Sequence, residues 1–244
     1  MSDISRAERA LHRRTALACE AATAAGVPGQ FRVWEQDEVL AVLATDPALT
    51  FLSTVTGPPA KVIALINTPI WHDITPTVLV TDPDAVPRLQ KAGLAPKEDR
   101  ILATRTLSTA PTTQPDIIAA NEQFPEILLA GYEVTGPVAE FIRAEHQHPT
   151  VKRYLAIAED KPIAAAAMTI HGDVAVLGGA STLRAHRGKG AQSRLLRHRI
   201  RVAVEAGCTL AVATASAKST SAANLQRAGF TLHQQQRWTP RPGR

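Results

Sequence analysis

The spacing of hydrophobic and polar positions in the first hundred residues predicts alternating helices and strands. Residues 3–25 carry Ala, Leu and charged residues at helical spacing, and the Gly26-Val27-Pro28-Gly29 segment then ends that pattern. Runs of β-branched residues such as 77–81 are typical of strands. We therefore expect helices over 3–25, 37–44 and 85–92, and strands over 50–56, 77–81 and 100–107.

The remainder of the chain follows a more regular pattern. Turns at 159–162 and 171–173 separate three apolar runs, which predicts an antiparallel meander. The segment 191–206 then places apolar residues on one helical face and arginines on the other. We expect helices over 114–123, 138–146, 191–206 and 221–228, and strands over 153–158, 163–170, 174–183, 209–214 and 230–233.

These elements together predict an α+β fold with a mixed, mostly antiparallel twisted sheet flanked by helices. A strand, a glycine-rich basic turn, an amphipathic helix and a buried strand form a βαβ crossover, and the meander precedes it. Pro111 and the threonines around it indicate a connector. We divide the chain into a smaller α/β domain over 1–100 and a larger domain over 101–244.

Composition fits a globular protein. The chain has 244 residues, of which 45% are hydrophobic, enough for a packed core. It contains no apolar run of membrane-spanning length and no signal-peptide pattern, so we expect a cytoplasmic protein without membrane contact. Cys19 and Cys208 lack the spacing of a zinc site or a disulfide framework, and we expect buried thiols and no metal.

Positive charge is concentrated in the last third of the chain. Between Asp173 and Glu205 there is no acidic residue, and none follows Glu205. Seven basic residues lie in that interval: Arg184, Arg187, Lys189, Arg194, Arg197, Arg199 and Arg201. Such a surface attracts anions, either nucleic acid or the phosphates of a cofactor. Because aromatic residues make up only 4% of the chain, a binder of single strands is disfavoured.

The segment Arg187-Gly188-Lys189-Gly190-Ala191 has the character of a phosphate-binding turn. Its glycines permit positive φ, so that backbone N–H groups can converge on an anion, and the following helix adds its own unpaired amides. A solvated basic turn is the alternative. A Walker loop is excluded because Gly190, not Ser or Thr, follows Lys189. A dinucleotide fingerprint is excluded by the glycine spacing.

These residues resemble the GNAT superfamily of acyl-CoA-dependent N-acyltransferases. The pyrophosphate motif of that family maps onto Arg187, Gly190 and position 192, where this chain has Gln192. The order of the strands and the segment ending in Gly229-Phe230 also fit, and the resemblance covers about residues 100–240. It implies a GNAT-like fold and acetyl-CoA as cosubstrate. The first hundred residues would then be a degenerate companion domain without cofactor.

The resemblance also implies which residues contact the cofactor. The family lodges it where two neighbouring strands splay apart, and Gly178-Gly179 fits that place as a bulge, although a bulge also simply relieves sheet curvature. Asn224 fits a contact to pantetheine or a brace within its own helix. The expected contacts are Gly179, Ala180, Ser181, Thr182, Leu183, Arg187, Gly188, Lys189, Gly190, Ala191, Gln192, Ser193 and Asn224.

The catalytic groups are less well defined by the sequence. Members of the family often carry a Tyr acid four residues before the Gly-Phe glycine, and here that position is Leu225. Ser221, Ser219 or water would have to replace it. The resemblance puts Glu133 beside the acceptor, which makes it the candidate base, with a solvated loop carboxylate as the alternative.

The sequence thus predicts an N-acetyltransferase that acts on a primary amine of a small molecule or peptide by direct attack. A non-catalytic acyl-CoA-binding module is the first alternative, because of Leu225. A nucleic-acid binder that uses the basic face from Arg194 to Arg201 is the second. We expect a monomer or a homodimer.

Overall fold

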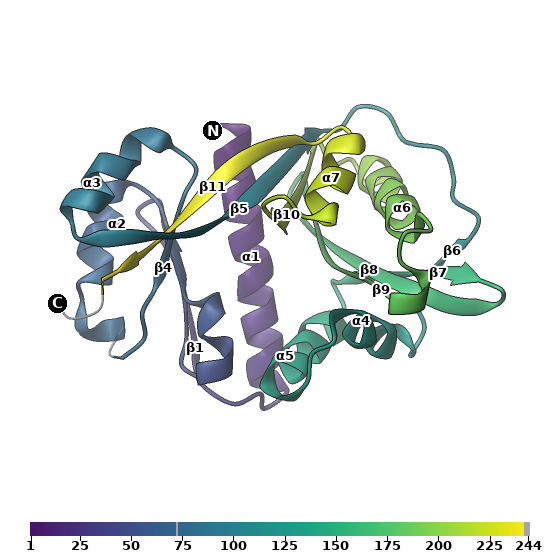
Figure 1. Cartoon of the computed structure of the whole chain (residues 1–244), viewed down its shortest axis with the longest axis horizontal. Coiled ribbons are helices and arrows are strands. Elements are labelled where there is room, and N and C mark those ends of the chain that lie inside the picture. The colour runs from purple at the N-terminus through teal and green to yellow at the C-terminus, as the bar shows by residue number, and fades with distance from the viewer. Residues whose placement is uncertain (72, 242–244) are drawn as a thin grey trace.

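The computed structural model describes residues 1–71 and 73–241. In these residues eleven strands form one sheet in the order β1-β2-β3-β4-β11-β5-β10-β9-β8-β7-β6 (Figure 1). The strands are β1 Phe31–Gln36, β2 Val39–Ala44, β3 Thr54–Thr56, β4 Thr77–Val80, β5 Leu94–Thr106, β6 Ile117–Ala119, β7 Lys152–Ala158, β8 Lys161–His171, β9 Val174–Thr182, β10 Leu210–Ser216 and β11 Thr231–Pro240. Neighbouring strands are antiparallel except for the pairs β3/β4 and β9/β10. The expected mixed, mostly antiparallel sheet is confirmed.

Helices lie on both faces of this sheet. They are α1 Asp3–Ala24, α2 Pro59–Ile66, α3 Val86–Lys91, α4 Phe124–Tyr132, α5 Gly136–Gln147, α6 Ala191–Glu205 and α7 Thr220–Arg227. Long α1 runs between the two halves of the molecule (Figure 1) and packs against β2 of the first half and against α5 and β9 of the second.

The two halves repeat one succession of elements. In each, a strand leads through a helix to a parallel strand and then through a second helix to a last strand, as β3-α2-β4-α3-β5 and β9-α6-β10-α7-β11. The halves exchange their last strands, because β5 pairs with β10 and β11 pairs with β4 as well as with β5. The structure therefore has a tandem, GNAT-like organisation. Residue 100 lies inside β5, and the division at that residue stays a prediction.

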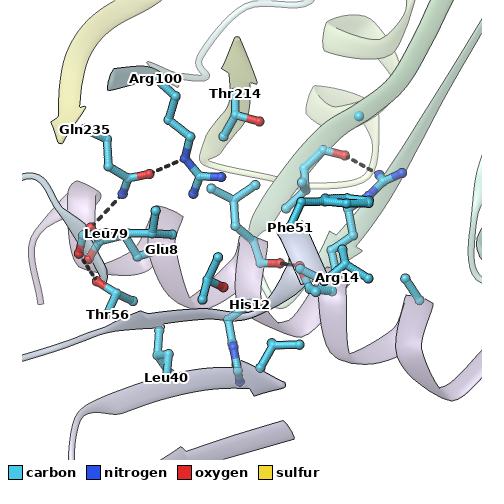
Figure 2. A pocket seen from close by; sticks show the side chains of 18 of the residues that line it. Glu8, His12, Arg14, Leu40, Phe51, Thr56, Leu79, Arg100, Thr214 and Gln235 are labelled. Carbon is cyan, nitrogen blue, oxygen red and sulfur yellow. Dashed lines mark hydrogen bonds between the residues drawn. The ribbon is translucent and has the colours of Figure 1, made fainter. Parts of the chain in front are cut away.

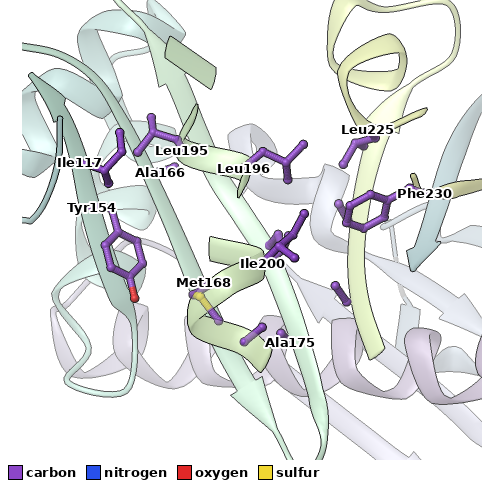
Figure 3. Close-up of a cluster of buried hydrophobic side chains, with 14 of the residues drawn as sticks. Ile117, Tyr154, Ala166, Met168, Ala175, Leu195, Leu196, Ile200, Leu225 and Phe230 are labelled. Atoms are coloured by element: carbon purple, nitrogen blue, oxygen red, sulfur yellow. The ribbon is translucent and has the colours of Figure 1, made fainter. Parts of the chain in front are cut away.

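The main core lies where α6 crosses the meander (Figure 3). Strand β8 carries four consecutive alanines, Ala164 to Ala167, and all are fully buried. Alternate side chains of a strand point to opposite faces, so Ala164 and Ala166 pack in the cluster with α6, and Ala165 and Ala167 pack with α4. Their small side chains let a helix approach each face closely.

Two expected helices are strands instead. Residues 39–44 form β2, because Asp37 and Glu38 both adopt positive φ, 51° and 66°, in the two-residue hairpin turn that joins β1 to β2. Residues 117–119 form the edge strand β6, and the helix begins only at Phe124, after an Asn121 side chain has accepted a hydrogen bond from the Gln123 amide. Residues 50–56 divide between a 3₁₀ helix, Pro47–Leu52, and short β3.

The other expected elements are present, with shifted ends. Helix α1 fits its prediction closely, and its N-terminus is capped by the Ser2 side chain. Strand β11 extends to Pro240, well beyond the expected 230–233, because its second part pairs with β4 of the first half.

Candidate functional site

Strands β9 and β10 are paired only at their beginnings. Their register runs from Val174–Leu210 to Val176–Val212 and then stops. Beyond this point the strands line a cavity of about 840 Å³, together with the first turn of α6, helix α7 and the end of α4. The expected splay of two neighbouring strands is therefore present, and it opens toward the turn between β9 and α6.

A β-bulge lies at the mouth of the splay, as Gly178-Gly179 predicted. Ala166 pairs with Ala180 and Ala167 with Gly178, so Gly179 is the extra residue, with a φ of +61°. A Cβ on Gly179 would lie 2.1 Å from Nε2 of the buried His146. Glycine is thus required both by its φ and by the imidazole packed against its Cα.

The amide released by this bulge contacts Tyr132, the last residue of α4. Ala180 N–H donates to the Tyr132 hydroxyl at 2.8 Å. Gly131 lets α4 lie this close, because a Cβ there would be 2.4 Å from Ser181 Oγ. Burial raises the pKa of Tyr132, so its hydroxyl keeps its proton at neutral pH. We did not single out Tyr132 from the sequence, since only the packing of α4 on β9 reveals its position.

The basic turn forms a concave backbone at the other end of the cavity. Gly188 and Gly190 have φ values of +78° and +80°, and Gly190 precedes α6 without a side-chain cap. Within the described residues, no acceptor bonds the backbone N–H of residues 191, 192 or 193. Unpaired amides at a helix start favour an anion.

Most expected cofactor contacts line this cavity. They are Gly179, Ala180, Ser181, Thr182, Arg187, Gly188, Gly190, Ala191, Gln192, Ser193 and Asn224. Leu183 and Lys189 do not line the cavity. Leu183 donates its amide to the Ile163 carbonyl, and the Lys189 carbonyl accepts from Arg194.

Arg187 and Glu133 contact each other. Arg187 Nη2 lies 3.1 Å from Glu133 Oε1 and also donates to the Gly131 carbonyl at 2.9 Å. Both side chains are about half exposed, at 50% and 56%. Glu133 is the left-handed C-cap residue of α4, and its carboxylate lines neither this cavity nor the one described below. The structure therefore places Glu133 beside the basic turn, outside the cavities.

Gln192 fills a place where the family pattern has a small residue. Its Nε2 donates to the Ser181 carbonyl at 2.6 Å and to Thr182 Oγ1 at 3.0 Å. The side chain thus ties the first turn of α6 to the end of β9, and the backbone amide of Gln192 stays free.

Helix α7 forms the opposite wall of the cavity. Ser221 is exposed on that wall, and Asn224 Oδ1 accepts from Arg227 at 2.6 Å, which braces the helix as one of the two expected roles required. Leu225 also lines the wall but is 5% exposed and packs in the core. Ser219 caps α7 by accepting from the Ala222 amide.

The basic face expected on α6 is largely neutralised. Arg194 forms an ion pair with Asp116 at 2.5 Å, and Arg201 pairs with Glu205. Arg199 is 3% exposed and lies on the sheet-facing side, where it donates to the Ala167 carbonyl at 3.0 Å. Burial lowers the pKa of Arg199 to about 10, so it remains a cation in the cavity wall. The placement of all arginines on the solvent face was therefore wrong.

A second, smaller cavity of about 290 Å³ lies on the other side of the splay. Both cavities are lined by Leu177, Gly178 and Thr214, which lie where β9 and β10 separate. Arg14 lies there, since a Cβ on Gly178 would be 3.0 Å from the Arg14 guanidinium carbon. Arg14 Nε donates to Glu145 Oε1 at 2.9 Å in a largely buried ion pair.

Glu145 is ionised in this pair. Burial by itself would raise its pKa, but the Arg14 guanidinium and His146 outweigh burial and hold the pKa below its usual range. The pairing of Glu145 with Arg14 could not be predicted from the sequence, because the two residues lie 131 positions apart in the chain.

Within residues 1–71 and 73–241, no three His, Cys, Asp or Glu side chains are grouped to hold a metal ion. Among the helices described, none combines the length and apolar character of a membrane span.

Comparisons with known proteins agree with this geometry. A family model described as the acetyltransferase (GNAT) family matches residues 121–230. No curated protein matches the chain. Among solved structures, a GCN5-related N-acetyltransferase from Kribbella flavida is 17% identical, with a TM-score of 0.61 over 95% of this chain and 96% of its own.

Two further structures share the fold at low identity. A tandem GNAT protein from the clavulanic acid biosynthesis pathway is 12% identical, with a TM-score of 0.60 over 93% of this chain and 88% of its own. A GNAT-family acetyltransferase from Colwellia psychrerythraea is 13% identical, with a TM-score of 0.59 over 87% and 86%. Residues 121–230 therefore form a domain of the acetyltransferase (GNAT) family, and the solved structures share the fold of nearly the whole chain.

Proposed function

We propose that this protein transfers an acetyl group from acetyl-CoA to a primary amine of a small molecule or peptide by direct attack. The observation that supports this most strongly is that two cavities share Gly178 and Thr214 in their linings and that unpaired amides lie at the far end of the larger one. A cosubstrate and an acceptor that enter from opposite sides can meet there without a covalent enzyme intermediate.

The larger cavity fits acetyl-CoA in the chemistry of its donors. The free amides of residues 191–193 and the glycines at 188 and 190 suit the pyrophosphate, as at other helix N-termini. Buried Arg199 adds a cation to the wall. The corresponding turn of the first half, Gly57-Pro58-Pro59, contains two residues without N–H and so has fewer donors. This favours a single cofactor site, in the second half.

Direct attack requires three contributions from the protein. The amine nitrogen forms a bond to the thioester carbon, the C–S bond breaks, the amine loses a proton, and the thiolate gains one. We assign Glu145 to attract the ammonium form and accept its proton, since its ionised carboxylate lines the smaller cavity and is paired with Arg14, which packs against Gly178. We assign the Ala180 amide to the developing oxyanion, which would replace the Tyr132 hydroxyl as the acceptor of this N–H.

Tyr132 is our candidate for the acid that protonates the thiolate. It lines the larger cavity beside the bulge, and its raised pKa keeps the proton on the hydroxyl until a base forms nearby. It would thus take the role of the family's Tyr acid, whose position in this chain is occupied by Leu225. Ser221 stays a second candidate, because its hydroxyl lies on the opposite wall.

Calorimetry and CoA release test this function in two steps. We expect acetyl-CoA to bind the wild type, and Arg187→Glu to weaken binding by tenfold or more, because it places a carboxylate beside the phosphate turn. No binding at high micromolar acetyl-CoA would refute the cofactor site. Binding without CoA release from any of a broad panel of amines would instead indicate an acyl-CoA-binding module.

Tyr132→Phe tests the assigned acid. It keeps the ring and removes the hydroxyl, so we expect kcat to fall roughly 100-fold, as for the loss of a general acid, with little change in acetyl-CoA affinity. Ser221→Ala serves as the matched variant on the opposite wall. If Ser221→Ala lowers kcat and Tyr132→Phe does not, the assignment of the acid must be reversed.

A further inference from the structure

The smaller cavity contains a cation that no carboxylate of the described residues contacts directly. Three side chains form a hydrogen-bonded series along one wall: Glu8, Gln235 and Arg100 (Figure 2). Thr81, behind this wall, donates to Glu8 Oε1. Gln235, which is 1% exposed, donates to Glu8 Oε1 at 3.2 Å and accepts from Arg100 Nε at 2.6 Å. The series fixes the guanidinium plane of Arg100 in one orientation.

Only one edge of the Arg100 guanidinium is used by the protein. Within the described residues, Nε alone has a hydrogen-bond acceptor, and no ion pair involves Nη1 or Nη2. In Figure 2 these terminal nitrogens point into the pocket, away from Gln235. Burial lowers the pKa of Arg100 to about 10, and the neighbouring Arg237 adds to this, so the group is still charged at neutral pH. A largely buried, charged fork with free donors is suited to a planar anion.

The remaining charges of the cavity restrict that anion. Its wall contains Arg14 and Arg100 as cations and Glu8 and Glu145 as carboxylates. Arg14 is already paired with Glu145, and Glu8 is coupled to Arg100 through Gln235. A dianion such as phosphate would add excess negative charge beside two carboxylates, whereas a carboxylate adds one charge in the shape that the guanidinium fork binds.

We propose that the acceptor is a small amine that also carries a carboxylate, and that Arg100 binds this carboxylate through Nη1 and Nη2. This inference rests on the proposed acetyl transfer. The cavity of about 290 Å³ holds roughly ten water molecules' worth of liquid, which suits a molecule of amino-acid size and not a folded protein surface. With its carboxylate at Arg100, the acceptor directs its amine toward Gly178 and Thr214, which line both cavities.

Amines matched in all but the carboxylate test the proposal. Full-length protein is assayed for CoA release with pairs such as lysine and 1,5-diaminopentane, ornithine and 1,4-diaminobutane, or phenylalanine and phenethylamine. For the wild type we expect kcat/KM at least tenfold higher for the carboxylate-bearing member of the pair that it uses best. Arg100→Gln is expected to abolish this preference through the KM of the acceptor.

Arg237→Gln is the matched control. It removes the same charge close to Arg100 but from a side chain outside the cavity lining, so the preference should remain. Calorimetry with acetyl-CoA on all three proteins shows that they fold and bind the cosubstrate. Arg100→Lys, which keeps the charge without the fork, should recover only part of the preference.

The outcomes separate the two proposals. If the wild type fails to bind acetyl-CoA, the proposed function fails. If it binds acetyl-CoA and acetylates amines but uses both members of each pair equally, the carboxylate proposal is overturned and the function stands. The carboxylate proposal is also overturned if Arg100→Gln and Arg237→Gln reduce the preference equally, because charge alone would then explain it.

Discussion

Replacing Gly179 by Ala tests the geometry at the mouth of the splay. The substitution introduces two costs: a residue with Cβ must adopt a φ of +61°, and the new Cβ meets Nε2 of His146 at 2.1 Å. The first costs about 1–2 kcal/mol. The second forces a 2%-exposed ring to move within the packing of α5 against β9, which costs about 1–3 kcal/mol. We expect the free energy of unfolding to fall by about 2–5 kcal/mol.

Two further variants separate these costs. Gly172→Ala has a similar φ of +60° with no atom within 4 Å of the new Cβ, so it should show only the backbone cost of about 1–2 kcal/mol. In a His146→Ala background the clash is gone, and Gly179→Ala should then cost about as much as Gly172→Ala.

Urea unfolding, followed by circular dichroism, measures each free energy, and the double-mutant cycle should give a coupling of about 1–3 kcal/mol. The reasoning is refuted if Gly179→Ala is no more destabilising than Gly172→Ala. It is equally refuted if removal of the His146 ring does not relieve the cost.

Three other predictions follow from the charges and thiols of the site. Glu145→Gln should lower kcat/KM roughly 100-fold in a CoA-release assay, whereas Glu133→Gln should stay within about twofold of wild type. If Glu133→Gln has the larger effect, Glu133 and not Glu145 is the general base. Burial raises the pKa of Glu8 above its ordinary 4.5, so the folded state holds the proton more tightly and unfolding free energy falls as pH rises from 4.5 through the folded pKa. Glu8→Gln should flatten this fall in urea titrations from pH 4 to 8, and an unchanged slope would contradict the assignment. Cys19 and Cys208 are buried, and burial raises the pKa of Cys19 to about 12. Ellman's reagent should therefore label neither thiol in the native protein within the time of an activity assay. Rapid labelling of Cys19 would show that α1 opens.

Local sequence patterns predicted the glycine-rich basic turn and the bulge. The glycines at 179, 188 and 190 adopt positive φ in turns and bulges whose sequence signals lie in adjacent residues. Their conformation can therefore be inferred from a short segment. The meander and α6 were equally accessible because their hydrophobic periodicity is unbroken. These features locate the far end of the larger cavity.

The smaller cavity depends on contacts between distant segments. Arg100 and Gln235 lie 135 residues apart and meet only because β11 pairs with β5. The arginines of α6 show the same limit: helical periodicity places Arg199 near the solvent face, but the alanines of β8 leave room for its guanidinium to reach the Ala167 carbonyl. Side-chain pairing of this kind cannot be deduced from spacing along one element.

The insertion of β11 between β4 and β5 also constrains the order in which the chain folds during synthesis. Strand β4 is complete at residue 80 and β5 at residue 106, but the strand that joins them ends at residue 240. Two sheet edges are therefore open while more than half of the chain is translated, and open edges favour association with other chains. The sheet that joins the two halves can therefore be completed only after the last strand has left the ribosome.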